Sequence, residues 1–179
     1  MSSNILVLSG SPRKNGNTER LMSAFVDGAT AVGKTVKTFC VAGLKIGGCR
    51  GCEYCFTHNG ICVQTDDMSP ILDELRKTDA LVLASPVYYF SVTAQLKLAI
   101  DRFFALLEDG MPVKRAALLM TCGDDTDAAA ASSIAMFRQI ASYQKWDEAG
   151  IIVAPSLHNP GEIEGRAELE QAKRLGENI

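Results

Sequence analysis

The loop that follows the first apolar run of the chain carries the residue types of a phosphate-binding site. Residues 5–8 have the pattern of a buried strand, and a helix pattern begins near Asn17. At the start of a helix the first N–H groups have no partner within the helix, and the helix dipole favours an anion. Gly10 and Gly16 allow the backbone to approach a ligand closely. Side-chain donors come from Ser9, Ser11, Asn17 and Thr18. We therefore predict a phosphate cradle in this loop.

The spacing of this loop excludes the two commonest nucleotide-binding motifs. The ATP/GTP loop requires G-x-x-x-x-G-K-[ST], but Gly10 and Gly16 are separated by five residues and Asn17 stands where the lysine belongs. The dinucleotide fingerprint G-x-G-x-x-G is also absent. Neutral donors without that lysine suit a terminal monophosphate. The alternative is a solvated turn in which Asn17 or Thr18 caps the helix.

Four cysteines in a second stretch have the spacing of a metal centre. Cys49, Cys52 and Cys55 form a C-x2-C-x2-C pattern, and Cys62 completes a group of four within fourteen residues. Four thiolates suit zinc or an iron–sulfur cluster. Structural zinc sites usually pair two separated C-x2-C units, whereas cysteines at successive intervals of three are closer to a [4Fe–4S] loop. An irregular connection as long as 42–65 is uncommon unless it binds something. Three interpretations stay open: a [4Fe–4S] cluster, a reduced loop without a cluster, and zinc.

Two further loops have the residues to hold a flat ring. The stretch 85–91 places three consecutive aromatic residues after Pro86, and their rings offer flat apolar faces. Alternatively, these aromatic residues belong to the core or to a subunit interface. The stretch 121–123, Thr-Cys-Gly, either offers backbone N–H groups to the far edge of a ring or is an ordinary strand-to-helix loop. A phosphate at one end and a planar ring at the other describe a mononucleotide.

Five apolar runs alternate with five helix-like segments, and this alternation positions the three loops. The strands are expected at 4–9, 35–41, 80–84, 113–121 and 149–153. The helices are expected at 17–32, 67–77, 91–108, 125–143 and 163–175. Such alternation predicts an α/β fold, a three-layer doubly wound parallel sheet with helices on both faces. Ligands of such sheets bind beyond the carboxyl ends of the strands, so the loops 9–17, 85–91 and 121–126 should converge on one cleft.

Several polar residues are expected to have structural roles only. Asp66 or Asp67 is expected to cap the second helix, and Cys40 is expected in the core of the second strand. His58 and His158 form no pair at metal-binding spacing, and we expect both at the surface rather than in catalysis. The sequence contains no Ser-His-Asp arrangement. Any chemistry would therefore come from a bound group.

Length and composition indicate one soluble domain. At 179 residues, with 47% hydrophobic and 22% charged residues, the chain is expected to form a single domain over 1–179, with the cysteine-rich loop at about 42–65. A net charge of −3 gives no reason to expect nucleic acid or an anionic membrane as a partner. No apolar run has the length of a membrane span. Without a signal peptide, we expect a cytoplasmic protein whose six cysteines are thiols or metal ligands.

Three stretches together resemble one family. The phosphate loop 10–18, the Ser-Pro-Val-Tyr of 85–88 and the pattern Gln-Leu-Lys…Ile-Asp-Arg within 95–102 are similar, in order and spacing, to the flavodoxin-fold NADPH-dependent FMN reductases. They resemble most the branch that includes the iron–sulfur flavoproteins. The resemblance covers most of 4–155 and weakens in the C-terminal part. It implies a flavodoxin-like five-stranded sheet with strand order 2-1-3-4-5.

The resemblance also implies a cofactor and the residues that hold it. FMN is expected in the cleft, where the flavin and not a catalytic side chain carries the chemistry. The residues expected to bind FMN are Ser9, Ser11, Arg13, Asn17, Thr18, Pro86, Val87, Tyr88, Tyr89, Thr121, Cys122 and Gly123. The residues expected to bind a [4Fe–4S] cluster are Cys49, Cys52, Cys55 and Cys62. Many relatives keep similar cysteines without a cluster, and the loop would then cover the flavin at a dimer interface.

The function implied by the resemblance is an FMN-dependent oxidoreductase. It would take hydride from NAD(P)H and pass electrons to a small acceptor. The alternatives are an FMN/[4Fe–4S] electron-transfer flavoprotein reduced by ferredoxin, and a non-redox module that binds a mononucleotide. The expected partners are NAD(P)H, a small electron acceptor and, for the second function, ferredoxin. The resemblance also implies a homodimer or homotetramer, with the third helix and the loop before it near the interface.

Overall fold

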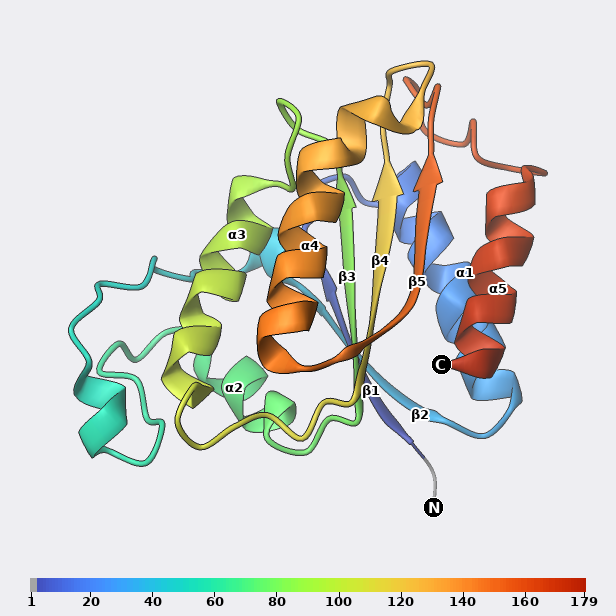
Figure 1. Cartoon of the computed structure of the whole chain (residues 1–179). Helices are drawn as coiled ribbons and strands as arrows, with labels where there is room; N and C mark the ends of the chain where they lie inside the picture. Colours follow the sequence, from blue (N-terminus) through green and yellow to red (C-terminus); the bar gives the residue numbers. More distant parts are fainter. Residues whose placement is uncertain (1–2) are drawn as a thin grey trace.

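A five-stranded parallel sheet forms the centre of the fold (Figure 1). The computed structural model describes residues 3–179. The strand order is β2-β1-β3-β4-β5, and every neighbouring pair is parallel. The strands are β1 (Asn4–Ser9), β2 (Thr35–Cys40), β3 (Ala80–Pro86), β4 (Arg115–Thr121) and β5 (Asp147–Ala154). The flavodoxin-like order predicted for the chain is confirmed.

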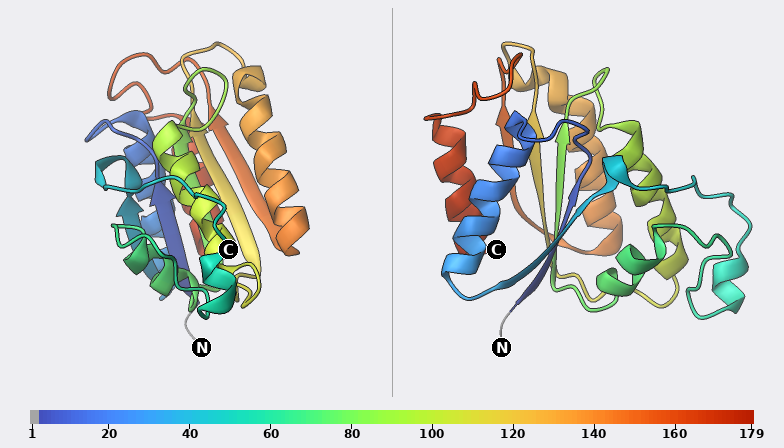
Figure 2. Two further views of the ribbon diagram at one scale, coloured as in Figure 1. Left: turned by 90° about the vertical axis from the view of Figure 1, so that its left-hand side faces the viewer. Right: turned by 180° about the vertical axis from the view of Figure 1, so that it is seen from behind.

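Helices cover both faces of the sheet, as the alternation predicted (Figures 1 and 2). The helices are α1 (Asn17–Ala31), α2 (Ser69–Leu75), α3 (Ala94–Asp101), α4 (Ala131–Gln144) and α5 (Ala167–Asn178). α1 and α5 lie on one face, and α2, α3 and α4 lie on the other. Successive strand residues point to opposite layers. Ile5 and Val7 belong to the apolar core under α1 and α5, whereas Leu6 and Leu8 belong to the core under α2, α3 and α4.

α1 and α5 pack at short range because each contributes a glycine to the contact. A Cβ added at Gly28 in α1 would overlap the backbone oxygen of Lys173, and one added at Gly176 in α5 would overlap that of Phe25. Glycine costs a helix about 1 kcal/mol relative to alanine. The close contact offsets this cost, because it buries Phe25 and Ala172 completely.

Helix boundaries differ from the expected ones where short 3₁₀ segments take over. The helix expected at 91–108 is α3 followed by a 3₁₀ helix, Arg102–Leu106. The helix expected at 125–143 starts with a 3₁₀ helix, Asp127–Ala130, before α4. α5 begins only at Ala167. None of the helices within residues 3–179 combines the length and the apolar character needed to cross a membrane.

Asp66 and Cys40 make contacts beyond the structural roles expected of them. No side-chain cap bond is made by Met68, the N-cap residue of α2, but Asp66 Oδ1 accepts from Met68 N (3.1 Å) in the turn that leads into the helix. The Asp66 carboxylate also accepts hydrogen bonds from both terminal nitrogens of Arg102. Cys40 is exposed rather than in the core, and its Sγ donates to a backbone oxygen of the phosphate loop (3.4 Å). The contacts with Arg102 and with the phosphate loop join residues far apart in the sequence, so local patterns did not indicate them.

The segment between β2 and α2 is irregular and projects beyond α3, at the left of Figure 1. Its tip carries a short 3₁₀ helix, Tyr54–Thr57. At its base, Gly47 N donates to Asp66 Oδ2 (2.9 Å) and so joins the two limbs of the loop. Nearer the tip, the rings of Phe56 and Phe104 pack with centroids 4.9 Å apart. This cysteine loop is therefore anchored to the domain at both ends.

Candidate functional site

A cavity of about 240 Å³ opens where the loops after β1, β3 and β4 meet. This is the edge of the sheet at which doubly wound folds bind ligands. The loop after β5 forms a fourth wall. The lining residues are Ser11, Arg13, Gly16, Asn17, Thr18, Pro86, Val87, Tyr88, Thr121, Cys122, Gly123, Leu157 and His158. The structure thus brings the three predicted loops to one cavity.

α1 begins at this cavity without a side-chain cap. Its N-cap residue is Gly16, which has no side chain, and among residues 3–179 no side chain accepts a hydrogen bond from the N–H groups of Asn17 or Thr18. The alternative of a helix capped by Asn17 or Thr18 is therefore wrong. The first N–H groups of a fifteen-residue helix are left to other acceptors, and the helix dipole adds positive potential there. An anion at this end of the cavity would accept hydrogen bonds from these N–H groups and would lie in the positive potential of the helix.

The serines of the phosphate loop shape the turn that leads into α1. Ser11 N donates to Ser9 Oγ (3.5 Å), and Arg13 N donates to Ser11 Oγ (3.3 Å). Each hydroxyl acts as acceptor in these bonds and keeps its own hydrogen for a further partner. Ser11 lines the cavity, whereas Ser9 is buried and does not line it. Ser9 therefore supports the loop from behind.

A buried hydrogen bond joins two of the cavity walls. Thr18 in α1 and Thr121 at the end of β4 share an Oγ–Oγ hydrogen bond of 2.7 Å. The two residues are 3% and 5% exposed, and both line the cavity. A hydroxyl can donate one hydrogen bond and accept others. If Thr121 donates to Thr18, the Thr18 hydrogen is directed to a ligand.

Asn17 anchors the fourth wall. Its side-chain Nδ2 donates to Asn159 O (2.8 Å), and its Oδ1 accepts from Gly161 N (2.9 Å). The Asn17 side chain is thus engaged by the loop after β5, while its backbone N–H belongs to the open start of α1. This loop brings His158 to the cavity, where its ring lies against Gly123.

His158 is exposed, as expected, and it also lines the cavity, which was not predicted. The sequence contained one signal that could have placed it there. Residues after the fifth parallel strand reach the same edge of the sheet as those after the other strands.

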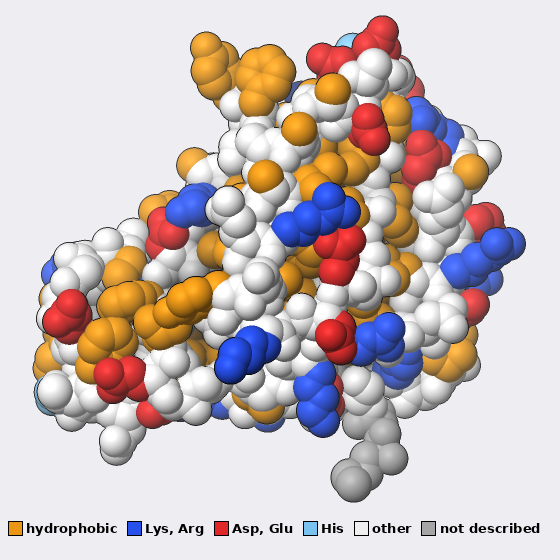
Figure 3. Space-filling view, in the orientation of Figure 1, with side chains coloured by type: hydrophobic (Ala, Val, Ile, Leu, Met, Phe, Trp, Pro, Cys, Tyr) orange, Lys and Arg blue, Asp and Glu red, His pale blue; other side chains and the backbone are white. Residues whose placement is uncertain are grey.

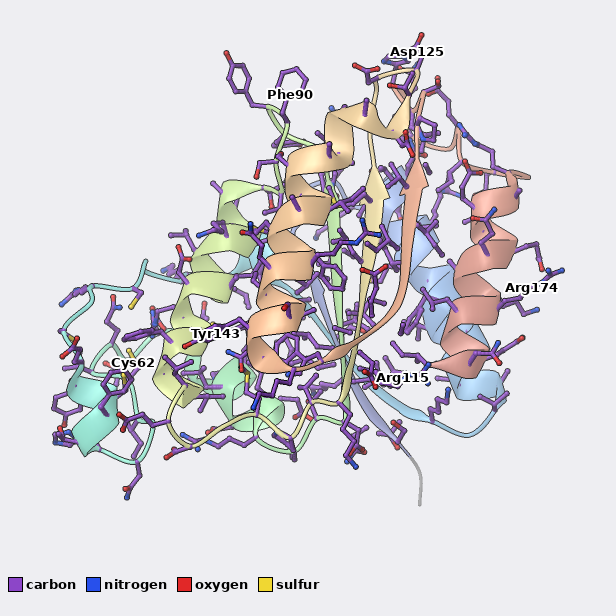
Figure 4. The ribbon with its side chains drawn as sticks, in the orientation of Figure 1. Cys62, Phe90, Arg115, Asp125, Tyr143 and Arg174 are labelled. Carbon is purple, nitrogen blue, oxygen red and sulfur yellow. The ribbon has the colours of Figure 1, made fainter. Side chains whose placement is uncertain are left out.

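The three aromatic residues after β3 do not act together. Val87 and Tyr88 line the cavity with Pro86. Tyr89 is 99% exposed and Phe90 is 63% exposed, and both have positive φ, 48° and 64°. This left-handed backbone turns their rings outward. Figure 3 shows hydrophobic side chains projecting from this rim, and Figure 4 labels Phe90 there. Tyr89, predicted as a cofactor-binding residue, does not line the cavity.

Most backbone N–H groups of the ring loops are already used. Val87 N donates to Thr121 O (2.7 Å), and Cys122 N donates to Ala154 O (3.0 Å). Gly123 N makes no hydrogen bond to any residue of the described part, 3–179. A Cβ at Gly123 would lie 3.1 Å from the His158 ring. Gly123 lines the cavity, so its N–H is a donor that this rim still offers to a ligand.

The thiol in the cavity wall is held neutral. Burial raises the pKa of the Cys122 thiol, and the negative charge of Asp124 raises it further. The thiol makes only long contacts to backbone oxygens, 3.9 Å to Asp124 O and 3.7 Å to Thr126 O. A neutral buried thiol is a poor nucleophile. Cys122 therefore contributes shape to the cavity and no covalent chemistry.

The four clustered cysteines line a second, small cavity within the cysteine loop. Cys55 is buried, Cys62 is partly buried, and Cys49 and Cys52 are exposed; all four are free thiols. Within residues 3–179 no group of three or more His, Cys, Asp or Glu side chains is placed to hold a metal ion. A preformed zinc site is therefore not found among the described residues. A cluster spreads its thiolate ligands over several iron atoms and does not require them around one point.

Arg102 also lines this cysteine cavity. Its side chain is 1% exposed, and its Nε has no hydrogen-bond partner within the described part of the chain. Burial lowers the pKa of Arg102, but the hydrogen bond to the Asp66 carboxylate helps to outweigh burial, and the pKa is raised. A buried N–H without an acceptor is costly. An anionic, thiolate-ligated group would supply that acceptor, so these residues fit a cluster.

Comparison with known proteins decides the family. A family model of NADPH-dependent FMN reductases matches residues 3–150, which include all three predicted loops. The chain belongs to the NADPH-dependent FMN reductase family. The description of this family makes FMN the expected ligand of the cavity and flavin-dependent redox chemistry the expected activity. The cavity described above is the candidate FMN site of this family member.

Within the reductase family the chain is similar to iron–sulfur flavoproteins. One from Archaeoglobus fulgidus is 43% identical over 93 residues, 52% of this chain and 42% of that protein. One from Methanocaldococcus jannaschii is 35% identical over 98 residues, 55% of this chain and 50% of that protein. The matched segment spans about half the length of these relatives. An azoreductase structure from Bacillus anthracis has the same fold, with a TM-score of 0.75 at 16% identity, covering 99% of this chain and all of that one.

Proposed function

We propose that this reductase takes hydride from NAD(P)H onto FMN and passes the electrons to a small acceptor. One observation supports the proposal most directly. The uncapped start of α1 and the loops 86–88 and 121–123 line a single cavity, so a phosphate and a ring can be bound together. When bound, FMN supplies the hydride and electron-transfer chemistry. The protein's task is to hold and orient it.

The phosphate end of FMN is assigned to the start of α1. The backbone N–H groups of Asn17 and Thr18 donate there together with the hydroxyls of Ser11 and Thr18. Arg13 also lines this end and adds a positive charge. Hydrogen bonds to a charged group are stronger than those between neutral groups. Neutral donors and one arginine are enough for a monophosphate.

The ring end of FMN is assigned to the opposite walls. Val87 and Tyr88 form one wall, and Gly123 with the adjacent His158 forms the other. A flavin bound between these walls would gain negative charge on its ring when reduced. The Gly123 N–H is fixed in position and has no competing partner among residues 3–179, so it can stabilise that charge without reorganisation.

Anaerobic mixing with reduced pyridine nucleotide tests this proposal. FMN-loaded protein is mixed with NADPH or NADH in a stopped-flow instrument, and bleaching of the flavin absorption is followed. We expect fast bleaching, with the acceptor then identified by adding quinones, metal ions or oxygen. A protein that takes up no FMN would instead support a non-redox module. Bleaching by reduced ferredoxin but not by either nucleotide would support an electron-transfer flavoprotein.

The cysteine loop supports a second centre in the same protein. We propose that Cys49, Cys52, Cys55 and Cys62 bind a [4Fe–4S] cluster. Their shared cavity and the unpaired Nε–H of Arg102 support this proposal. So does the similarity to proteins named iron–sulfur flavoproteins. With a cluster, electrons can leave the flavin one at a time, and the electron-transfer function becomes available to the same chain.

Cysteine variants separate a cluster from zinc and from free thiols. Protein purified without oxygen is analysed for iron, acid-labile sulfide and zinc, and its absorption spectrum is recorded. We expect iron and sulfide in equal amounts, and their loss in Cys62→Ser. Cys40→Ser is the matched control, because Cys40 is exposed and lies outside the cysteine cavity. Zinc without sulfide, or four titratable thiols without metal, would contradict the cluster.

A further inference from the structure

Arg102 is an unusual charge in this fold because it is buried at the edge of the cysteine cavity. It begins the 3₁₀ helix that follows α3, and its side chain is 1% exposed. A guanidinium is always charged and carries five N–H donors. Burial of such a group is costly unless it is paired and hydrogen-bonded. The hydrogen-bond partners of Arg102 therefore indicate the role of this buried charge.

Four hydrogen bonds use the two terminal nitrogens of Arg102. Nη1 donates to Asp66 Oδ2 and to Gly47 O, each at 2.8 Å. Nη2 donates to Asp66 Oδ1 at 3.2 Å and to Gln64 O at 3.5 Å. These contacts close the neck of the cysteine loop, since Gly47 and Asp66 lie on its two limbs. They leave one donor, the Nε–H, without a partner among residues 3–179.

The remaining donor belongs to a side chain that lines the same cavity as all four cysteines. Cys62 is the cysteine nearest along the chain to Gln64, whose backbone oxygen accepts from Arg102 Nη2. Figure 4 places Cys62 in the loop beyond α3, far from Phe90 at the rim of the FMN cavity. Arg102 is therefore directed to the cysteine centre and not to the flavin. A neutral thiol is a weak acceptor for a guanidinium N–H, whereas a metal-bound thiolate is a strong one.

We propose that Arg102 is a positioning residue that raises the reduction potential of the cysteine-bound cluster by donating its Nε–H to the sulfur of Cys62. The inference rests on the proposed cluster. One-electron reduction adds one negative charge to the sulfur-ligated group. A fixed cation and an N–H bond to a ligand sulfur stabilise the more negative state, and both are known determinants of cluster potential. Asp66 opposes this effect, because its carboxylate offsets part of the guanidinium charge.

The roles of Arg102 and Asp66 predict changes of opposite sign. Arg102→Gln removes the cation, so we expect about a tenfold smaller equilibrium constant for one-electron reduction, a midpoint potential about 59 mV lower. Asp66→Asn leaves the cation uncompensated and should raise the potential. Arg76→Gln is the matched control. Arg76 also holds the cysteine loop, through Asn59 O (2.9 Å) and Asp109 Oδ2 (3.1 Å), but does not line the cysteine cavity.

The experiment is an anaerobic redox titration of the FMN- and cluster-loaded protein, with the reduced cluster followed by electron paramagnetic resonance. We expect a lower potential in Arg102→Gln, a higher one in Asp66→Asn and the native value in Arg76→Gln. Loosening of the loop would move all three variants the same way. Equal shifts in the three, or an unchanged potential in Arg102→Gln, would overturn the role of Arg102.

Two further outcomes keep this inference separate from the cluster proposal. If the native protein has no iron–sulfur signal, the cluster proposal fails and the inference fails with it. If Arg102→Gln does not retain its cluster, Arg102→Lys and Asp66→Asn still decide. Lysine keeps the charge but lacks the Nε–H. A potential in Arg102→Lys that is below the native value, but by less than the roughly 59 mV expected for loss of the cation, supports the inference. A potential in Asp66→Asn that is not above the native value overturns it.

Discussion

The Thr18 hydroxyl offers the most direct test of where the FMN phosphate lies. Thr18 lines the cavity at the start of α1, is 3% exposed and shares a 2.7 Å hydrogen bond with Thr121 Oγ. When Thr121 donates in that bond, the Thr18 hydrogen is left for the phosphate. Valine is similar in shape to threonine but has no hydroxyl. Thr18→Val therefore removes the donor with little change in volume.

The expected loss follows from the strength of one hydrogen bond. A hydrogen bond to a charged group contributes about 1.5–3 kcal/mol. Because about 1.4 kcal/mol corresponds to a tenfold change in affinity, Thr18→Val should raise the Kd for FMN by about 10- to 150-fold. Thr121→Val should raise it less, since Thr121 stands behind Thr18 and does not itself donate to the phosphate. The order of the two effects is part of the prediction.

Thr30→Val is the matched control on the same helix. Thr30 is exposed and donates to Val26 O (2.9 Å), away from the cavity. FMN binding to the apoprotein is measured by quenching of flavin fluorescence, and thermal unfolding of each apoprotein checks the fold. Thr18→Val with native affinity and an intact fold would refute the placement of the phosphate. So would an equal loss in Thr30→Val, because the effect would then belong to the helix as a whole.

Three other predictions concern the scaffold. Gly28→Ala should lower the free energy of unfolding by about 1–3 kcal/mol, as overpacking usually does. Helix propensity alone predicts the opposite, a gain of about 1 kcal/mol. The free energy measured by urea unfolding decides between the two signs. The hydrogen bond to Arg102 lowers the pKa of Asp66 from its ordinary 3.8 despite burial. The stabilisation from this pair is thus present above about pH 4 and lost as the pH falls through the lower folded value. Native protein should be more stable than Asp66→Asn at pH 7, and this difference should shrink as the pH falls below about 4 in urea titrations. We propose that the expected homodimer uses the apolar groove between α3 and α4, where Tyr143 is 70% exposed (Figure 4); Tyr143→Asp should then yield a monomer of native stability in light scattering.

The sheet and the convergence of the three loops could be predicted because both follow from local patterns. Apolar runs separated by helix-like segments leave few possible topologies, and a parallel sheet has only one edge of carboxyl ends. The phosphate loop was recognisable from the residue types between β1 and α1. The loop after β5 obeys the same rule, but its residue types gave no sign of a ligand. His158 was therefore missed, although its position in the topology was available.

The remaining differences come from one distant contact and one local turn. Asp66 has the residue type and place of a helix cap and accepts from Met68 N, but a buried arginine 36 residues later also binds its carboxylate. Tyr89 has the residue type of a ring-binding side chain, but a tight turn in which Tyr88 N donates to Ser91 O (2.8 Å) directs it outward. Residue propensities and motif spacing do not predict which residue pairs with a buried charge, or in which direction a side chain in a turn points.

α3 connects the candidate FMN cavity to the cysteine cavity, so the structure of both depends on this one short helix. At its start, Thr93 caps the helix by accepting from Leu96 N (3.3 Å) and donates to Gly10 O (2.9 Å) in the phosphate loop. A Cβ at Gly10 would lie 2.7 Å from Leu96 Cβ, so only glycine allows this approach. At its end, Arg102 holds the neck of the cysteine loop. An eight-residue helix rises about 12 Å. One rigid segment of that length therefore fixes both the FMN-phosphate loop and the cysteine cavity. Gly10→Ala should weaken FMN binding more than it changes the cysteine cavity.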